Sequence, residues 1–355
     1  MTLLVYGAYG YTGELISGAA VARGLDPILA GRHGDRLRDL GRDLRADVRE
    51  FDLAIPEVVA ESVRDVDAVL NCAGPFADTA EPLVDACMET GTDYLDVTGE
   101  WRVLAALADR DAEAAAAGVT LLPAVGFDVV ATDCLAATLV DRLPDATELV
   151  LGFDADGTVS RGTARTAVRG LGEGPVVRRD GRLVRGGGGR DPARRFDRER
   201  RLDFGRGERP ALAVAWGDVV TAAHTTGVEN VTVYVALDPR VMRALRLSRP
   251  LGPILRTRPV RWLLDRAVAG RVEGPTADDR ASNEVYVRGE VRSADGDRVA
   301  ERLRTPDPYD LTVETALAAV ERVADGRCPN GFTTPAGAFG PSFIDVVDGV
   351  RWLDR

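Results

Sequence analysis

Short apolar runs alternate with amphipathic stretches along the first third of the chain. Six apolar segments, typical of strands buried on both faces, are each followed by apolar residues at helical spacing or by a capped helix. The predicted strands are Thr2–Tyr6, Pro27–Gly31, Val48–Asp52, Asp67–Ala73, Tyr94–Val97 and Val119–Val125. Strands that alternate with helices predict an α/β fold with a Rossmann-type, doubly wound parallel sheet. We assign this sheet to residues 1–130, with a long helix over Glu100–Ala117 before the last strand.

The rhythm changes after Asp128. Longer strands, several joined by turn sequences, are predicted at Glu148–Phe153, Ala211–Trp216, Val231–Leu237, Glu284–Val291 and Arg298–Leu303. Helices are predicted at Ala131–Asp141, Gly162–Leu171 and Thr312–Val323. We therefore expect a second α+β domain at residues 131–330, built on a largely antiparallel sheet, followed by a C-terminal segment at residues 331–355.

Two segments allow more than one structural interpretation. Arg178–Arg209 mixes arginines with acidic residues and is predicted to form a long hairpin or loop. Val241–Val268 is apolar and flanked by arginines, so it predicts either core or dimer-interface packing or peripheral contact with a membrane surface. A formal net charge of −11 argues against nucleic acid as a partner. With no transmembrane run and a strand predicted at residue 2, we expect a cytoplasmic protein.

The clearest binding motif is the segment GAYGYTG, which joins the first strand to the first helix. Glycines at this spacing allow a tight turn, close approach of a phosphate and close packing of the helix on the strand. The helix N-terminus then presents backbone N–H groups to an anion. We assign to a dinucleotide site the residues Gly7, Tyr9, Gly10, Tyr11, Thr12 and Gly13.

The second strand indicates which dinucleotide is bound. An NAD-preferring protein usually has Asp or Glu at the end of this strand, but here Arg32 stands there, with Arg36 one helical turn further on. A guanidinium pairs well with a 2′-phosphate, so the cofactor is predicted to be NADP. Asp52, after the third strand, is either a hydrogen-bond acceptor for the adenine amino group or an exposed loop residue. Cys72, Ala73 and Gly74, after the fourth strand, are expected beside the phosphates and the nicotinamide ribose.

Proton transfer is assigned to the ends of the fifth and sixth strands. The candidate acids are Tyr94, Asp96, Glu100 and Asp128, although Glu100 and Asp128 are equally well explained as helix-start or turn carboxylates. The cysteines have no metal-ligand spacing, and no metal site is predicted. All 45 basic residues are arginine, which excludes mechanisms that need a lysine. This acidic, lysine-free composition also indicates adaptation to high salt.

Several motifs together resemble the saccharopine dehydrogenase-like oxidoreductases, and most closely their trans-acting enoyl reductase branch. The resemblance is carried by GAYGYTG, AGR at Ala30–Arg32, NCAGPF at Asn71–Phe76, YLDVTGE at Tyr94–Glu100, AVGFDVVATD at Ala124–Asp133, WGDVVTAAHTTGVENVTVY at Trp216–Tyr234, PYDLTVETAL at Pro308–Leu317 and GFTTPAGAFG at Gly331–Gly340. It implies an NADP-binding domain, a substrate or dimerisation domain and a C-terminal segment that returns to the first domain. Saccharopine turnover itself is disfavoured, because it relies on a lysine that this chain lacks.

The resemblance implies an NADP-dependent oxidoreductase that reduces an activated C=C bond of a lipid or isoprenoid precursor. The substrate would be a small, lipid-like molecule, and a homodimer fits the second domain. Two alternatives remain from the residues: an NADP-binding redox sensor without turnover, and a carbonyl or imine reductase on the same scaffold. A lysine-free chain without an evident acid–base pair is compatible with each of them.

Overall fold

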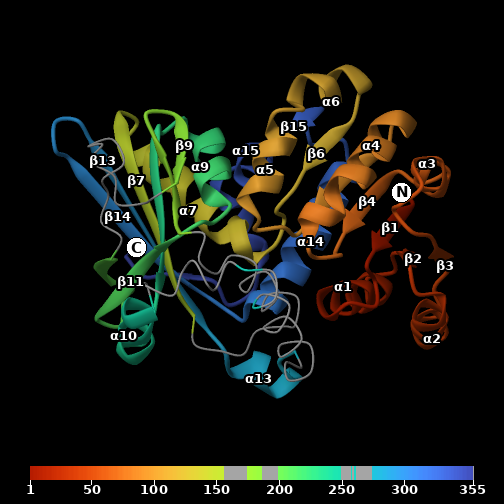
Figure 1. Cartoon of the computed structure of the whole chain (residues 1–355), viewed down its shortest axis with the longest axis horizontal. Helices are drawn as coiled ribbons and strands as arrows, with labels where there is room; N and C mark the ends of the chain where they lie inside the picture. The colour runs from red at the N-terminus through yellow and green to blue at the C-terminus, as the bar shows by residue number, and fades with distance from the viewer. Residues whose placement is uncertain (156–173, 186–198, 249–256, 258–259, 261–273, 355) are drawn as a thin grey trace. The chain divides into compact units, whose positions relative to one another are not determined.

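The chain folds into two compact units, shown in Figure 1 for a computed structural model that describes residues 1–155, 174–185, 199–248, 257, 260 and 274–354. The first unit contains residues 1–130 and 308–347, and the second contains residues 131–307 and 348–355. The expected second domain at residues 131–330 therefore ends too late, because residues 308–330 belong to the first unit. The C-terminal segment expected at residues 331–355 is likewise divided between the units.

The first unit is built on a parallel sheet of seven strands in the order β15-β6-β5-β4-β1-β2-β3. The strands are β1 (Leu3–Tyr6), β2 (Ile28–Gly31), β3 (Val48–Glu50), β4 (Ala68–Asn71), β5 (Asp93–Asp96), β6 (Thr120–Leu122) and β15 (Gly331–Phe332). Each pairs in parallel with its neighbours, and β1 lies between β2 and β4. The predicted Rossmann-type sheet is confirmed, with a seventh strand contributed by the C-terminal part of the chain.

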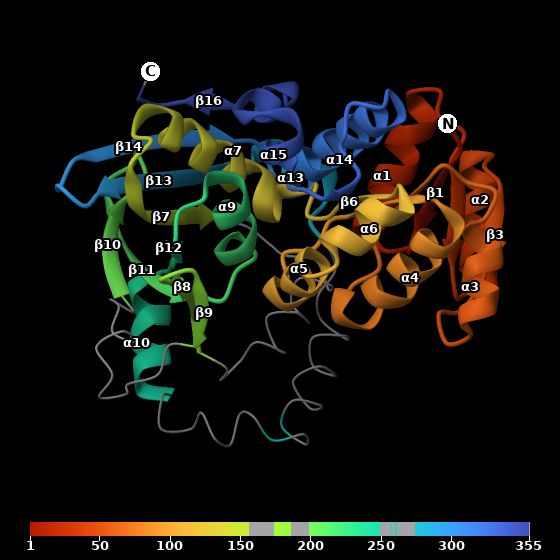
Figure 2. The ribbon, with the colours of Figure 1, turned by 90° about the horizontal axis from the view of Figure 1, so that it is seen from above.

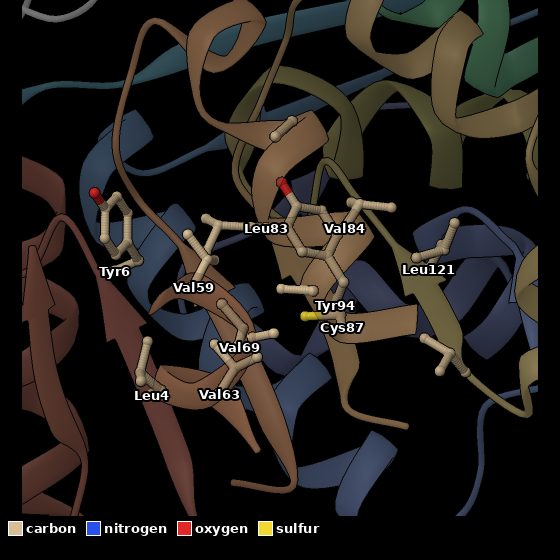
Figure 3. Close-up of a cluster of buried hydrophobic side chains, with 14 of the residues drawn as sticks. Leu4, Tyr6, Val59, Val63, Val69, Leu83, Val84, Cys87, Tyr94 and Leu121 are labelled. Atoms are coloured by element: carbon tan, nitrogen blue, oxygen red, sulfur yellow. The ribbon is translucent and has the colours of Figure 1, made fainter. Parts of the chain in front are cut away.

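Helices cover both faces of this sheet. They are α1 (Tyr11–Ala22), α2 (Gly34–Leu44), α3 (Pro56–Val63), α4 (Ala80–Thr90), α5 (Trp101–Ala108), α6 (Asp111–Ala117), α14 (Pro308–Ala324) and α15 (Pro335–Phe339), with 3-10 turns η1 (Phe76–Asp78) and η4 (Pro341–Val346). Figure 2 shows α1 and α14 on one face and α4 and α6 on the other. Figure 3 shows Leu4, Val69 and Tyr94 from the strands packed with Leu83 and Cys87 of α4. Burial of this apolar layer fixes which side chains each strand presents to the helices.

The long helix predicted over Glu100–Ala117 is wrong, because the structure divides it into α5 and α6. Arg110 lies at the break and pairs with Asp85 of α4 at 2.5 Å and with Glu113 of α6 at 2.9 Å. Asp111, the first residue of α6, accepts a hydrogen bond from the backbone N–H of Phe332 in β15 at 2.8 Å. The break therefore directs α6 toward the seventh strand, a partner that local periodicity does not reveal.

The second unit contains a nine-stranded mixed sheet within the described residues. Its strands are β7 (Ala146–Ala155), β8 (Val176–Arg179), β9 (Arg182–Arg185), β10 (Glu199–Asp203), β11 (Glu208–Val214), β12 (Asn230–Ala236), β13 (Val285–Ser293), β14 (Arg298–Thr305) and β16 (Arg351–Trp352). All pairings are antiparallel except the pairing of β12 with β7. The expected α+β domain with a largely antiparallel sheet is confirmed.

Helices α7 (Phe127–Arg142), α9 (Asp218–Thr226), α10 (Pro239–Ser248) and α13 (Ala277–Ser282) accompany this sheet, with α7 beginning in the first unit. Gly289 of β13 allows Leu135 and Leu139 of α7 to approach the sheet, since a Cβ there would lie 2.5 Å from the Leu139 side chain. Within the described part of Arg178–Arg209, β8 with β9 and β10 with β11 form two antiparallel pairs.

Two of the expected segments lie largely outside the described residues. The helix predicted at Gly162–Leu171 falls entirely outside them, as does most of Val241–Val268. Among the helices that the structure describes, none combines the length and the apolar character needed to cross a membrane.

Candidate functional site

The glycine loop after β1 forms a turn that leaves no room for a side chain at Gly7 or Gly13. Gly7 has a φ of +83°, and a Cβ on this residue would lie 2.8 Å from the side chain of Ala73. A Cβ on Gly13 would lie 2.3 Å from the carbonyl oxygen of Gly7. The N–H of Gly10 donates to that same carbonyl oxygen at 2.9 Å. The loop thus holds β1 and α1 closer together than residues with side chains permit.

The start of α1 meets the requirements of a pyrophosphate site. Gly10 is its N-cap residue, and no side chain caps the helix there. The first turn contains Tyr11, Thr12 and Gly13, whose backbone lies at the positive end of the helix dipole. The residues present therefore fit the phosphates of a dinucleotide.

Tyr9, between the first two glycines, connects the loop to the residues that follow β2. Its ring lies against Gly31, where a Cβ would approach the ring to 2.7 Å. The guanidinium of Arg36 lies 4.6 Å from the Tyr9 ring centroid and donates to the Tyr9 carbonyl oxygen at 2.9 Å. His33 packs against the same ring, with 5.6 Å between centroids. Arg32 is exposed directly after β2, so the two predicted arginines and the aromatic pair occupy one end of the sheet.

The other predicted cofactor residues have local structural partners as well. Asp52 is exposed and accepts a hydrogen bond from the N–H of Ala54 at 2.9 Å, so it stabilises its own turn. Cys72 continues from β4, with its N–H donating to the Tyr6 carbonyl oxygen at 2.8 Å. Burial, together with the charge of Asp96, raises the pKa of the Cys72 thiol far above its usual range. Both effects disfavour the thiolate form of Cys72.

A buried hydrogen-bond chain joins the ends of β4, β5 and β6. The Asn71 amide donates to the Tyr94 hydroxyl oxygen at 3.2 Å, and that hydroxyl donates to Oδ2 of Asp96 at 2.9 Å. Oδ1 of Asp96 accepts from the N–H groups of Thr98 at 2.9 Å and Ala124 at 2.8 Å. The side chains of both Tyr94 and Asp96 are fully buried. Both catalytic candidates thus take part in positioning the strand ends.

Burial determines the pKa values of the groups in this hydrogen-bond chain. It raises the pKa of Asp96 to about 6, even though three hydrogen bonds to the carboxylate favour its charged form. Burial and the neighbouring charge of Asp96 raise the pKa of the Tyr94 hydroxyl well above its usual value. Ala124, which donates to Asp96, has a φ of +59°, a conformation that alanine seldom adopts. The Asp96 carboxylate therefore supports a strained turn at the end of β6.

Glu100 and Asp128, the other candidate acids, lie near one another at the same end of the sheet. Glu100 accepts hydrogen bonds from the N–H groups of Phe76 at 3.0 Å and Ala77 at 3.2 Å, and so holds the turn that follows β4. Asp128, in the first turn of α7, packs against Gly99, where a Cβ would lie 2.7 Å from its Oδ2. Burial, reinforced by the charge of Glu100, raises the pKa of Asp128 to about 6. The residue as a whole keeps some exposed surface, although its carboxyl group lies among protein atoms.

Sequence reasoning missed several residues that shape this edge. Oγ1 of Thr79 donates to the Ala73 carbonyl oxygen at 2.7 Å, which holds the loop after β4. Thr315 of α14 donates to the Val125 carbonyl oxygen at 2.7 Å, and Thr312 accepts from the N–H of Phe127 at 3.0 Å. Asn71 had a signal, because a polar residue ending an apolar strand is unusual. The threonines of α14 had none, since roughly two hundred residues separate them from their partners.

A comparison with protein families matches residues 3–122 to the saccharopine dehydrogenase NADP-binding domain. The matched segment runs from β1 to β6 and contains the glycine loop, Arg32 and the Asn71–Tyr94–Asp96 chain. NADP is therefore the cofactor indicated for this domain. Binding of NADP agrees with the cradle of glycines and with the arginines that follow β2.

Curated relatives share part of the chain. A trans-acting enoyl reductase of Mycobacterium leprae is 34% identical over 139 residues, which cover 37% of this chain and 33% of the relative. A saccharopine dehydrogenase-like oxidoreductase of Mus musculus is 29% identical over 204 residues, covering 50% of this chain and 47% of the relative. The matched part thus spans less than half the length of these relatives.

A likeness of fold extends over both units. Apo saccharopine dehydrogenase (L-Glu forming) from Saccharomyces cerevisiae superposes with a TM-score of 0.61, covering 97% of this chain and 95% of that chain, at 13% sequence identity. At this identity the similarity shows the fold alone. The arrangement of a parallel sheet followed by a mixed sheet is therefore shared with a solved dehydrogenase.

Proposed function

We propose that this protein is an NADP-dependent oxidoreductase, because residues 3–122 match the saccharopine dehydrogenase NADP-binding domain. The observation that carries the proposal is the glycine loop at the start of α1, where a Cβ on Gly7 would clash with Ala73 and a Cβ on Gly13 with the Gly7 carbonyl oxygen. Arg32 and Arg36 add positive charge after β2, where a 2′-phosphate would lie. The glycine loop thus suits the pyrophosphate of NADP, and the two arginines suit its 2′-phosphate.

The substrate in this proposal is an activated alkene of a lipid or isoprenoid precursor. Support comes from the resemblance to the trans-acting enoyl reductase branch and from the 34% identity to a relative of that name. The lack of lysine disfavours saccharopine turnover, and with it the chemistry for which the family is named. An activated alkene needs a hydride at one carbon and a proton at its neighbour.

Different residues of the chain would bind the cofactor and position the nicotinamide. Gly7, Gly10 and Gly13 let backbone N–H groups approach the pyrophosphate, and Arg32 pairs with the 2′-phosphate. Glu100 holds the turn at Phe76 and Ala77, which follows β4 and borders the nicotinamide side of the sheet. NADPH, when bound, supplies the hydride. Positioning by these elements lowers the barrier by restricting how the two reactants meet.

We assign proton delivery to Asp128 among the four candidates. Tyr94 and Asp96 are fully buried, and their oxygens take part in the hydrogen-bond chain described above. Glu100 accepts two backbone N–H groups and is suited to hold its turn as a carboxylate. Asp128 is partly exposed and has a pKa of about 6, so it carries a proton in part of the molecules near neutral pH. Its proton would pass to the carbon next to the one that receives the hydride.

The test begins with cofactor binding to the purified full chain. We expect NADPH to bind more tightly than NADH, and Arg32→Ala to lower NADPH affinity about 10- to 100-fold, the loss of one or two charged hydrogen bonds. NADH affinity should change little in the same variant. Equal effects on both cofactors would contradict the role given to Arg32.

The second part of the test measures NADPH oxidation with matched α,β-unsaturated acyl or isoprenoid compounds and with saturated ketones and imines. We expect turnover of the unsaturated compounds, with the saturated product identified by mass spectrometry. Turnover of ketones or imines alone would support the carbonyl or imine reductase. Tight NADPH binding without oxidation across the panel would favour the redox sensor.

A further inference from the structure

Tyr309, on the first turn of α14, lies beside the start of α1. Its ring centroid is 4.9 Å from that of Tyr11, and the two rings meet edge to face at 81°. Tyr11 directly follows Gly10, the N-cap residue of α1. Both tyrosines are partly buried. An aromatic side chain from almost 300 residues along the chain therefore reaches the edge of the candidate pyrophosphate site.

The same turn of α14 also reaches the end of β6. Thr312, three residues after Tyr309, accepts a hydrogen bond from the N–H of Phe127 at 3.0 Å. A Cβ on Gly126 would lie 3.0 Å from the Thr312 side chain, so this side chain packs closely on the backbone of Gly126. The start of α14 thus extends from the glycine loop to the loop after β6. In a doubly wound sheet, the pyrophosphate and the nicotinamide half of the cofactor lie along this side.

The packing of α14 on α1 holds Tyr309 in this place. Arg23, just after α1, pairs with Glu314 at 2.5 Å and with Glu321 at 3.8 Å, so the two helices also contact one another toward their C-terminal ends. Thr315 anchors α14 to the Val125 carbonyl oxygen at 2.7 Å. These contacts hold the middle and the C-terminal part of α14 in place, and the contacts of Tyr309 and Thr312 hold its start.

We propose that the Tyr309 ring forms a wall of the cofactor site on its nicotinamide-ribose half, with Tyr11 holding the ring in position. The proposal rests on the use of NADP proposed above. Tyr309 lies outside the matched NADP-binding domain at residues 3–122, so the cofactor site is completed by a helix that follows the second unit in sequence. An aromatic wall suits the flat nicotinamide ring and its ribose, which present apolar faces.

Binding of two ligands to the full chain separates this role from others. NADPH has both halves of the dinucleotide, whereas 2′,5′-ADP has the 2′-phosphorylated adenosine half and no nicotinamide. We expect Tyr309→Ala to lower NADPH affinity about 3- to 10-fold, in line with the loss of one aromatic contact, and to change 2′,5′-ADP affinity less than about 2-fold. Isothermal titration measures both dissociation constants without any substrate.

Further variants make the comparison decisive. Tyr309→Leu keeps apolar bulk at the start of α14, so it tests the aromatic ring where alanine destabilises the helix, and the same selective loss is expected. Arg32→Ala should weaken both ligands, because both have the 2′-phosphate. Tyr286→Leu, the matched change in the second unit, should alter neither affinity. Thermal unfolding confirms that each variant is folded.

Equal losses for both ligands, or unchanged NADPH affinity in a folded Tyr309 variant, would overturn the proposal. Failure of the unmodified protein to bind either ligand would instead overturn the proposed use of NADP. Weak binding of NADPH by the unmodified protein, no tighter than that of 2′,5′-ADP, would show that the nicotinamide half finds no wall here.

Discussion

Asp96 and Asp128 both lie close enough to Glu100 to feel its charge, and their pKa values shift in the same direction, but their surroundings differ. Burial raises the pKa of each to about 6. Asp96 is fully buried and accepts three hydrogen bonds from groups on β5 and the loops after β5 and β6. Asp128 keeps part of its residue surface exposed, and the charge of Glu100 raises its pKa as it does that of Asp96. Two carboxyl groups with similar pKa values therefore have different roles: Asp96 is a structural residue, and Asp128 is a candidate proton donor.

The pH dependence of turnover tests the role of Asp128. A donor with a pKa of about 6 is protonated below that pH, so the turnover number should fall about tenfold per pH unit above it. Asp128→Asn cannot donate this proton, and we expect kcat to fall about 100- to 10,000-fold, with loss of the pH-dependent limb. Steady-state kinetics between about pH 5 and pH 9 measure both effects.

The matched control is Asp109→Asn, an identical change at an exposed position after α5. It should retain the activity and the pH profile of the unmodified protein. If Asp128→Asn kept the original pH profile at a reduced rate, the titrating donor would be another group.

At the scale of elements, α14 is the helix that completes the first unit. It packs along α1, and Thr312 and Thr315 bond to the loop that follows β6. That loop contains Ala124, whose positive φ is supported by the hydrogen bond to Asp96. The end of β6 is therefore fixed from two directions, by β5 within the sheet and by α14 from its face.

A single hydroxyl on α14 should contribute measurably to stability. Thr315→Val keeps the shape of the side chain but removes the hydroxyl group, which lies 2.7 Å from the buried Val125 carbonyl oxygen and 2.9 Å from that of Leu311. We expect the free energy of unfolding to fall by about 1–3 kcal/mol, because that oxygen loses a partner it cannot replace with water. Denaturant unfolding followed by circular dichroism measures the change.

Thr90→Val is the corresponding control, since Thr90 donates to the Ala86 carbonyl oxygen at 2.8 Å near the partly exposed end of α4. Its cost should stay below about 1 kcal/mol, because water reaches this site. An equal loss in the free energy of unfolding at both positions would mean that the hydrogen bond from α14 to the loop after β6 stabilises the protein no more than an ordinary helix hydroxyl does.

Two elements show where local sequence patterns were insufficient. The alanine-rich stretch after Glu100 has helical propensity throughout, yet it is interrupted at Arg110, where Asp85 holds the Arg110 side chain and the backbone of Phe332 holds Asp111 at the start of α6. β15 contains only two residues, too few to show any periodicity, and forms because β6 presents an unpaired edge. Both features depend on partners that are distant in sequence.

At the scale of the whole molecule, charge is the most unusual property. The net charge is −11, and all basic residues are arginine. In the second unit, Glu290 is nearly buried and pairs with Arg288 at 2.9 Å and Arg292 at 3.1 Å, and also with Arg298. Although burial opposes its ionisation, hydrogen bonds from Arg288 and Arg298 hold the pKa of Glu290 below its usual value. Arginine suits such clusters because its planar group makes several hydrogen bonds at once.

Salt should stabilise this protein. Unpaired acidic residues repel one another, and raising KCl from about 0.1 M to about 1 M shortens the screening length from about 10 Å to about 3 Å. We expect the melting temperature to rise over this range, because salt weakens the repulsion between acidic residues on the surface. The buried ion pairs around Glu290 are screened less, so their contribution to stability is retained. Differential scanning calorimetry measures the shift.

A double variant, Asp43→Asn with Asp295→Asn, provides the control at two exposed positions. It raises the net charge of −11 by two, so its salt-induced rise should be smaller. A melting temperature that falls with salt in both proteins would mean that surface ion pairs outweigh the net repulsion.

The sequence by itself determined the parallel sheet, the glycine loop and the arginine after β2, because strand periodicity, turn chemistry and the residue at a strand end are local properties. It also indicated which strand ends contain the candidate acids. Only the tertiary structure decided that Tyr94 and Asp96 are buried, that α14 belongs to the first unit, and that Tyr309 lies beside Tyr11. Burial and contact between distant segments depend on how the whole chain packs, which no short window of residues specifies.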